Sequence, residues 1–375
     1  MTVRYSFVST YPPTRGGLAS FAASLRAALV AISPDAGPVI RVVDEPQNSA
    51  PPEVVGELVA GDRGAIRGAA RVVNGSDLAI VQHDFGIYGG DDGADVLALL
   101  DAVRVPTVVV LHAVPNLSTS GRRTVLQGVL ARAEAVVLMT LAARDRLLAQ
   151  YDVPSEKVKV IPYGAHHAGA MLTGPGRAGR PIVLTWGLLG PDKGIEWGIE
   201  AIRELRALDP VPRYLVAGQT RPEVLRSEGE AYRGRLVAQV ERLRLGDVVE
   251  LDGRYQDAAS LGRLIRSTDV VLLPYEATDQ ITSGVLSEAV AALIPVVATP
   301  FPHAVELLSG GAGRLVGYRD PAGMAAALRA VLTDPEVAAG MRRAAARAAP
   351  VLSWPIVARR YRELAAELLV PAGVR

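Results

Sequence analysis

Lys193 stands out among the residues that could do chemistry, because the chain contains almost no other lysine. Lysine and arginine together number 40, yet the only lysines are Lys157, Lys159 and Lys193. A retained lysine in an arginine-rich chain indicates a need for its compact point charge, which differs from the planar guanidinium fork. It lies in Gly187-Leu-Leu-Gly-Pro-Asp-Lys193-Gly194, between an apolar run and a helical pattern. Such a strand-to-helix loop is where α/β proteins bind anions, although position alone fits a solvated surface lysine equally well.

A second segment places polar groups at the start of a helix. An apolar run ends at Pro274, and a helical pattern of apolar residues begins after Ser283, the expected N-cap. Thr282, Ser283 and Gly284 would then offer hydroxyl and backbone N–H groups to an anion. Glu288 follows in the second turn and leans back toward this end, where a carboxylate can hold a diol such as ribose. The alternative is a carboxylate that only interacts favourably with the helix dipole.

A pair of glycines marks a third loop. The first apolar run is followed by Thr10-Tyr-Pro-Pro-Thr-Arg-Gly16-Gly17, and a helical pattern begins near Ala19. Glycine lets the backbone approach a ligand closely, and a helix start presents unpaired N–H groups. The loop lacks the GxGxxG spacing of dinucleotide-binding folds, which counts against a dehydrogenase. Taken alone, a glycine pair before a helix is more often an ordinary turn.

Composition excludes several classes of protein. The 375 residues are 49% apolar and carry a net charge of +1, so a large core is expected and a nucleic-acid partner is not. Cysteine is absent, which excludes disulfides, a thiolate nucleophile and a cysteine-ligated metal. The first ten residues form one short strand pattern rather than a signal peptide, and no apolar stretch is long enough to span a bilayer. We therefore expect a soluble, cytoplasmic protein.

The elements that must position these residues alternate along the chain. Short β-branched runs are separated by longer segments with apolar residues at helical spacing, such as Phe21–Ile32 and Glu196–Leu208. This alternation predicts parallel sheets covered by helices on both faces. The first series of expected strands is Arg4–Ser9, Val39–Val43, Leu78–Gln82, Thr107–His112, Ala135–Met139 and Val158–Pro162. The second series is Ile182–Trp186, Arg213–Ala217, Val248–Leu251, Val270–Pro274 and Val296–Thr299.

Two series of strands predict two domains with a linker between them. Residues 168–179 are rich in glycine and proline and have no apolar period, which is typical of a linker. We expect an N-terminal Rossmann-like domain over residues 1–170 and a C-terminal one over residues 180–352. Residues 353–375 begin with an N-cap signal at Ser353 and continue with helical spacing, which predicts a closing helix.

Five short segments form a set when they are taken in chain order. They are Thr14-Arg-Gly16-Gly17-Leu-Ala-Ser-Phe21, Val110-Leu-His112, Val160-Ile-Pro-Tyr-Gly164, Gly187-Leu-Leu-Gly-Pro-Asp-Lys193-Gly194, and the pair Gln280 and Glu288. Together they resemble the motifs of the family 4 glycosyltransferases, and the resemblance covers nearly the whole chain. The terminal helix with Trp354 is similar to the one that returns to the N-terminal domain in that family.

Two positions depart from the family pattern. Leu188 stands where the family has an arginine beside the glycine, which removes one of two cations that usually grip the donor diphosphate. Arg221 and Arg254 follow the next two strands and are candidates to replace it. Gln280 stands where the family has a glutamate, so this side chain can hydrogen-bond sugar hydroxyls but carries no charge.

The resemblance implies an α/β protein of the GT-B fold. Two Rossmann-like parallel-sheet domains would face a central cleft, with acceptor binding in the first, donor binding in the second, and a C-terminal helix crossing back. The implied reaction is retaining transfer of a sugar from a UDP- or GDP-linked donor to an acceptor hydroxyl, a hexosyltransferase activity. Lys193, His112 and Glu288 are the expected catalytic residues, with His112 near the reacting carbon of the donor sugar.

The resemblance also implies the remaining binding residues and partners. Donor contacts are expected from the residues already named and from the loop that borders the nucleobase: Gly16, Gly17, Lys193, Arg254, Tyr255, Gln280, Thr282, Ser283, Gly284 and Glu288. The acceptor side would include His83, Asp84 and Tyr88, and the acceptor would be a carbohydrate, a lipid-linked molecule or a natural product. No metal or cofactor is expected.

The sequence is also compatible with other functions. Leu188 and Gln280 also fit a catalytically inactive nucleotide-sugar-binding scaffold, and a nucleotide-sugar epimerase would share the same architecture. A phosphorylase with pyridoxal phosphate would need a Schiff-base lysine, for which only Lys193 is suitably placed, and the chain is short for that class. Basic residues near 122–132 either form a solvated helix face or touch the inner face of the membrane. His303 is expected near the donor or in a structural role.

Overall fold

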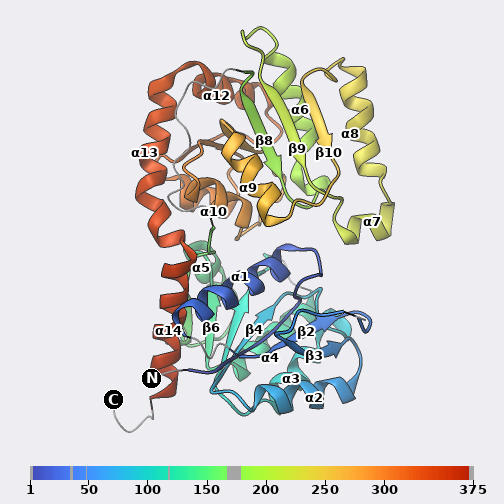
Figure 1. Cartoon of the computed structure of the whole chain (residues 1–375), viewed down its shortest axis with the longest axis vertical. Coiled ribbons are helices and arrows are strands. Elements are labelled where there is room, and N and C mark those ends of the chain that lie inside the picture. Colours follow the sequence, from blue (N-terminus) through green and yellow to red (C-terminus); the bar gives the residue numbers. More distant parts are fainter. Residues whose placement is uncertain (1–2, 34–36, 48, 117–118, 167–178, 371–375) are drawn as a thin grey trace. The chain divides into compact units, whose positions relative to one another are not determined.

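Two units make up the chain in this computed structural model, which describes residues 3–33, 37–47, 49–116, 119–166 and 179–370. The first unit comprises Met1–Gly164 and Trp354–Arg375, and the second comprises Ala165–Ser353. Each unit has its own sheet (Figure 1) and its own apolar core. The first predicted domain ended at residue 170, whereas the first unit ends at Gly164. The closing helix was predicted from residue 353, and the chain returns to the first unit at Trp354. Most of the predicted linker lies outside the described residues.

Seven parallel strands form the sheet of the first unit within the described residues, in the order β3-β2-β1-β4-β5-β6-β7. Most of their residues are buried, as expected for a sheet covered on both faces. The strands are β1 (Tyr5–Ser9), β2 (Val39–Val43), β3 (Val54–Val59), β4 (Leu78–His83), β5 (Thr107–Leu111), β6 (Ala135–Leu138) and β7 (Val158–Val160).

Helices follow these strands in the same alternation. They are α1 (Gly17–Ile32), α2 (Arg63–Val73), α3 (Asp95–Ala102), α4 (Ser120–Arg132) and α5 (Leu141–Gln150), with short 3-10 turns at Asp91–Gly93 and Ser155–Lys157. The closing helix α14 (Trp354–Leu369) completes the first unit.

Six parallel strands form the sheet of the second unit in the described part of the chain, in the order β10-β9-β8-β11-β12-β13. They are β8 (Ile182–Trp186), β9 (Arg213–Ala217), β10 (Val249–Asp252), β11 (Val270–Leu273), β12 (Val296–Ala298) and β13 (Gly313–Leu315). The helices are α6 (Ile195–Glu204), α7 (Pro222–Glu228), α8 (Ala231–Arg242), α9 (Ala258–Ser267), α10 (Gly284–Ala291), α11 (Pro302–Leu308), α12 (Pro321–Thr333) and α13 (Pro335–Leu352), and a 3-10 turn spans Pro191–Lys193.

The closing helix α14 supplies part of the core of the first unit. Trp354, Val357 and Tyr361 are buried in one cluster with residues of β1 and α1. The Trp354 ring lies directly over Gly164, where a Cβ atom would come within 2.3 Å of the ring. Any side chain at position 164 would therefore displace the tryptophan, which explains the glycine at the end of the first unit. The predicted closing helix is present, and it belongs to the first unit.

The strand order reverses once in each sheet. In the first unit β1 lies between β2 and β4, and in the second unit β8 lies between β9 and β11. At such a switch point the connections leave toward opposite faces of the sheet, which opens a crevice beyond the carboxyl ends of the two central strands. The loops after β1 and β4, and those after β8 and β11, are therefore where ligand-binding residues are expected.

Candidate active site

The Lys193 loop leaves the carboxyl end of β8 and is held against the carboxyl end of β11. Gly194 adopts a left-handed conformation with φ 57°, which favours glycine. A Cβ atom there would lie 2.1 Å from the Pro274 carbonyl oxygen, so only glycine allows this approach. The Glu276 backbone N–H also donates to the Asp192 carbonyl oxygen at 2.9 Å. Two loops from the switch point of the second sheet are thus fixed side by side.

Lys193 has few polar partners for its charge. Its Nζ lies 4.0 Å from the centroid of the Tyr275 ring, a cation–π geometry, and 3.6 Å from Asp192 Oδ2. The side chain is 17% exposed. Burial lowers the pKa of Lys193; Asp192 opposes that shift, and the neighbouring Arg221 adds to it. An anionic ligand would relieve this desolvation by supplying the missing negative charge.

The start of α10 lies beside the same tyrosine. Ser283 is the N-cap of α10, as the sequence predicted, and its Oγ accepts from the Leu286 N–H at 3.3 Å. Burial raises the pKa of Tyr275, and a hydrogen bond with the Ser283 side chain works in the opposite direction. Tyr275 therefore connects Lys193 to the first turn of α10. Tyr275 was not among the site residues predicted from the sequence, although an aromatic side chain two residues after β11 was a visible signal.

His303 holds the same helix start through a hydrogen bond to the backbone of Ser283. Its Nδ1 accepts a hydrogen bond from the Ser283 backbone N–H at 2.8 Å, and the ring is 5% exposed. Burial lowers the pKa of His303 to about 4, so the ring is neutral near pH 7 and can accept through Nδ1. The structure therefore gives His303 the structural role that the sequence left as one of two options.

Thr282 and Gln280 complete the loop before α10. Within the described residues Thr282 Oγ1 is buried and has no hydrogen-bond partner. Gln280 donates through Nε2 to the Thr282 carbonyl oxygen at 3.1 Å. A buried hydroxyl without a partner costs free energy, so a ligand oxygen or nitrogen at this place would satisfy it.

Glu288 already accepts from one backbone N–H group. Both of its carboxylate oxygens accept from the His166 N–H, at 3.1 and 3.2 Å. A carboxylate has about four lone-pair sites, so it can still accept hydrogen bonds from a diol. The predicted ribose contact is untested by this arrangement and stays a prediction.

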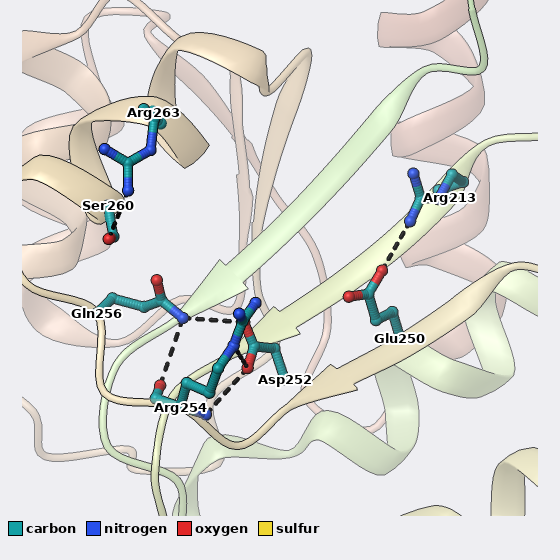
Figure 2. Close-up of polar contacts among 7 residues, drawn as sticks. All are labelled: Arg213, Glu250, Asp252, Arg254, Gln256, Ser260 and Arg263. Carbon is teal, nitrogen blue, oxygen red and sulfur yellow. Dashed lines mark hydrogen bonds and ion pairs between the residues drawn. The ribbon is translucent and has the colours of Figure 1, made fainter.

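Arg254 and Tyr255 follow β10, the edge strand beside β9, and Figure 2 shows Arg254 with its polar partners. Arg254 donates to both carboxylate oxygens of Asp252 at 2.9 Å, and Gln256 donates to the same carboxylate at 3.0 Å. The hydrogen bond from Arg254 is the main cause that lowers the pKa of Asp252. The Arg254 side chain is 83% exposed and Tyr255 is 39% exposed. Both side chains are accessible to a ligand, and their predicted place at the nucleobase remains a prediction.

The glycine pair opens the first switch point. α1 begins at Gly17, two residues earlier than expected, with Gly16 as its N-cap. A Cβ atom at either position would meet nothing within 4 Å among the described residues, so the space over this helix start is open. Backbone N–H groups in the first turn of a 16-residue helix are therefore available to an anion.

His112 follows β5 and is held by a neighbouring strand. Its Nε2 lies 2.6 Å from Gln82 Oε1, and its ring packs edge-on against Phe21 with centroids 5.1 Å apart. Burial, and to a smaller degree His83, lower the pKa of His112 to about 3. A neutral imidazole with Nε2 bonded to an amide oxygen carries its proton on that nitrogen. Gln82 was not predicted as a site residue, although it was a polar side chain in an otherwise apolar strand.

The three residues expected on the acceptor side differ in their exposure to solvent. His83 is 0% exposed, and neither ring nitrogen has a hydrogen-bond partner among the described residues. Tyr88 is 6% exposed and donates to the Gln82 carbonyl oxygen at 2.7 Å. Asp84 is half-buried and accepts from the Gly86 N–H at 3.1 Å. His83 and Tyr88 therefore support the loop in this structure, and a direct acceptor contact stays a prediction.

The arginines near residues 122–132 have partners within the chain. Arg122 pairs with Asp92 at 3.2 Å, Arg123 donates to the Gln150 carbonyl oxygen at 2.7 Å, and Arg132 pairs with Asp101 at 2.7 Å. These contacts do not test whether this face also touches a membrane, and that alternative stays a prediction. In the described part of the chain no helix is long and apolar enough to cross a membrane. Nor does that part hold a group of three or more histidine, cysteine, aspartate or glutamate residues arranged for a metal.

Sequence relatives of this chain are glycosyltransferases. Residues 180–334 match a family model described as "Glycosyl transferases group 1". The chain is similar to a phosphatidyl-myo-inositol mannosyltransferase from Mycolicibacterium smegmatis, 29% identical over 265 residues that cover 69% of this chain and 64% of that protein. It is also similar to a D-inositol 3-phosphate glycosyltransferase from Kineococcus radiotolerans, 31% identical over 257 residues that cover 63% of this chain and 57% of that protein. The matched region spans less than two thirds of either relative.

Solved structures share the fold over nearly the full chain. A glycosyltransferase from Rickettsia africae superposes with a TM-score of 0.76 at 16% identity, covering 98% of this chain and all of that one. HepE from Anabaena, in complex with UDP and glucose, gives a TM-score of 0.75 at 19% identity, covering 98% of this chain and 100% of that one. Together with the two parallel-sheet α/β units, these neighbours confirm the GT-B fold that the sequence predicted.

Proposed function

We propose that the whole chain transfers a sugar from a nucleoside diphosphate sugar to an acceptor hydroxyl, on the premise that residues 180–334 match the family model "Glycosyl transferases group 1". The observation that carries the proposal is the place of Lys193. Its partly desolvated ammonium group lies over the ring of Tyr275, and the Tyr275 hydroxyl is hydrogen-bonded to Ser283, the N-cap of α10. A cation and a helix start thus meet at the switch point of the second sheet, where α/β folds bind phosphates.

The chemistry requires stabilisation of the leaving group. When the bond from the sugar to the diphosphate breaks, negative charge grows on the phosphate oxygens. Lys193 can interact with that charge directly, and the N–H groups of the first turn of α10 add the positive end of the helix dipole. Because both are held in place by the loops after β8 and β11, little reorganisation is needed as charge develops.

The finer parts of the proposal follow the family resemblance. We assign UDP or GDP as the nucleotide, retention of configuration, His112 as a contact of the donor sugar and Glu288 as a contact of the ribose. Retention by front-face attack requires no protein nucleophile, because the leaving phosphate accepts the proton of the acceptor. HepE from Anabaena was solved with UDP and glucose, which supports a uridine donor as the first one to test.

The reaction as proposed uses no metal or cofactor, and the protein works in the cytoplasm. Lys193 and the α10 start would do what a divalent cation does in metal-dependent transferases. Transfer should therefore persist after treatment with EDTA, and a strict requirement for added Mg²⁺ or Mn²⁺ would overturn this part. The proposed acceptor is a carbohydrate, a lipid-linked molecule or a natural product, and the transfer assay includes acceptors of all three classes.

The test is a transfer assay with a matched lysine variant. Release of nucleoside diphosphate from UDP- and GDP-sugars, with and without an acceptor panel, is measured for the wild type, Lys193→Ala and Lys159→Ala. Lys159 pairs with Glu367 on the first unit, so its removal is a control for the loss of one lysine charge. We expect a loss of two or more orders of magnitude for Lys193→Ala only. Comparable turnover by the two variants would contradict the proposal.

Two rivals have distinct outcomes in the same assay. A nucleotide-sugar epimerase would convert the donor to its epimer with no release of nucleotide and no need for an acceptor. An inactive scaffold would bind the donor and leave it intact with every acceptor. Either product pattern replaces transfer as the function, while binding of the nucleotide by itself does not separate the three.

A further inference from the structure

Arg221 lies beside Lys193 although it comes from another strand. It follows β9, and its guanidinium donates to Asp192 through Nη2 to Oδ1 at 2.5 Å and through Nη1 to Oδ2 at 3.4 Å. Lys193 Nζ lies 3.6 Å from Oδ2 of the same carboxylate. Arg221 is among the causes that lower the pKa of Lys193, as expected for two close cations. Two positive charges therefore share the Asp192 carboxylate, and Arg221 Nε also lies 3.8 Å from Glu223 Oε2.

The backbone fixes this arrangement. Leu189 N–H donates to the Gln219 carbonyl oxygen, and the Arg221 N–H donates back to the Leu189 carbonyl oxygen, both at 2.8 Å. This pair of bonds forms a short parallel bridge between the loop after β8 and the loop after β9. The position of Arg221 is thus set by main-chain geometry and does not depend on a flexible loop.

Glycines make room for the arginine and for the loop contact. A Cβ atom on Gly190 would come within 2.7 Å of Arg221 Nη2, and a Cβ atom on Gly218 within 1.9 Å of the Gly187 carbonyl oxygen. The Arg221 side chain is 35% exposed, so part of its fork remains accessible beyond Asp192. Asp192 lies between the two cations, and the second carboxylate near Arg221, that of Glu223, is 66% exposed. Water screens the exposed Glu223 charge, so the two cations still attract a dianionic or trianionic ligand.

We propose that Arg221 is the second cation of the donor diphosphate site, supplied by the loop after β9. This inference rests on the proposed function, because it requires that Lys193 binds the diphosphate. Arg254, the other candidate, donates to both oxygens of Asp252 at the end of β10, and among the described residues its hydrogen bonds do not reach the Lys193 loop. When the donor binds, the free N–H groups of the Arg221 fork contact a phosphate oxygen while Asp192 keeps the fork oriented.

The primary experiment is calorimetric titration of the full-length protein with UDP, GDP, ADP and dTDP. The nucleotide that the wild type binds most tightly is then titrated into Arg221→Ala and Arg226→Ala. Arg226 lies on α7 five positions away, is 68% exposed and pairs only loosely with Glu223 at 3.9 Å, so it controls for the loss of charge. We expect affinity to fall about tenfold or more for Arg221→Ala and to stay unchanged for Arg226→Ala.

Substitution of Asp192, the partner of Arg221, distinguishes a structural role of Arg221 from a direct contact with phosphate. If Arg221 acted only by orienting Asp192, its removal would have no further effect in an Asp192→Asn background. A direct phosphate contact predicts a further loss of about tenfold in that background. Arg221→Gln, which keeps a donor for Asp192 and removes the charge, is expected to lose affinity like the alanine variant and serves if the latter does not fold. Retained affinity in Arg221→Gln, or no loss in the double variant, would overturn the inference.

Failure of this inference and failure of the proposed function are distinguishable. If the wild type binds a nucleoside diphosphate and Lys193→Ala abolishes that binding while Arg221→Ala does not, only the role of Arg221 falls. If the wild type binds none of the four nucleotides, the proposed function falls, and the inference falls with it.

Discussion

At the scale of single residues, the candidate site contains a partly buried positive charge with few ion-pair partners and a buried hydroxyl group without a hydrogen bond among the described residues. Lys193 has one shared carboxylate and an aromatic ring, and Thr282 has a buried hydroxyl without a partner in the described residues. Neither arrangement favours the folded protein, because buried polar groups are stabilised by partners. Residues that are left in this state at the end of central strands are typical of a ligand site.

His83 shows a comparable state in the first unit and gives a pH prediction. It is fully buried, and burial lowers its pKa to about 4 from the usual value near 6.5. Between these values the unfolded chain binds one more proton than the folded protein, so stability falls as pH falls. We expect the free energy of unfolding to drop by about 2 kcal/mol less in His83→Leu than in the wild type between pH 6.5 and 4.5.

Urea unfolding at a series of pH values measures this difference. His112 and His303 are also depressed and stay in both proteins, so the wild-type slope is reduced and not abolished. Identical pH slopes for the two proteins would show that folding leaves the pKa of His83 unchanged, which would contradict its burial as a neutral ring.

At the scale of elements, the strands that the sequence predicted are those with buried β-branched runs, and the two that it missed lie at sheet edges. β3 (Val54–Val59) is only half buried and contains Gly56, and β13 (Gly313–Leu315) has three residues. The edge strands β7 and β10 were predicted all the same, so edge position alone does not hide a strand. Gly56 interrupts the β-branched run of β3, and the three residues of β13 are too few to carry a period.

The candidate site was predictable to the extent that it follows the chain locally. Lys193, Ser283 and the helix start could be inferred from loop position and capping preference. The contacts of Tyr275 and Arg221 could not, because they depend on which strands become neighbours and on how two loops pair. Strand order is a property of the whole sheet and is not written in any one segment.

Ser283 gives a prediction at the level of the helix. Ser283→Ala removes the N-cap of α10 and the bond to Tyr275, and we expect a loss of about 1 kcal/mol in stability together with weaker nucleoside diphosphate binding. Asp62→Ala is the matched control, since Asp62 caps α2 in the first unit by accepting from the Gly64 N–H. Thermal unfolding and calorimetric titration of both variants measure the two effects. Equal nucleotide affinity in the two variants would show that the α10 start does not hold the phosphates.

At the scale of the whole molecule, each unit has a separate core, and the end of the chain completes the first one. Trp354, Val357, Tyr361 and Leu364 of α14 are all at most 6% exposed. The second unit needs no residue after Ser353 for its own core. The two units therefore depend differently on the last helix.

Truncation after Ser353 tests this dependence. Removing α14 exposes the apolar cluster around β1 and α1, so we expect the first unit to lose its structure while the second keeps its fold. Hydrogen exchange measures the result as lost protection in β1, β4 and β5 with retained protection in β8, β9 and β11. Protection of β1 equal to that of the intact chain would contradict the placement of α14 in the first core, and Arg359→Ala on its exposed side should change neither unit.

The central claim is that Lys193 marks a nucleoside diphosphate site, and thermal unfolding with added nucleotide tests it most directly. Wild type and Lys193→Ala are each unfolded alone and with saturating UDP, GDP, ADP or dTDP. A ligand at a hundred times its dissociation constant stabilises the folded state by about 2.7 kcal/mol, which is a clear rise in Tm for a domain of this size. We predict such a rise with one of the four nucleotides in the wild type and its loss in Lys193→Ala. No rise with any nucleotide, or the same rise in the variant, would contradict the account.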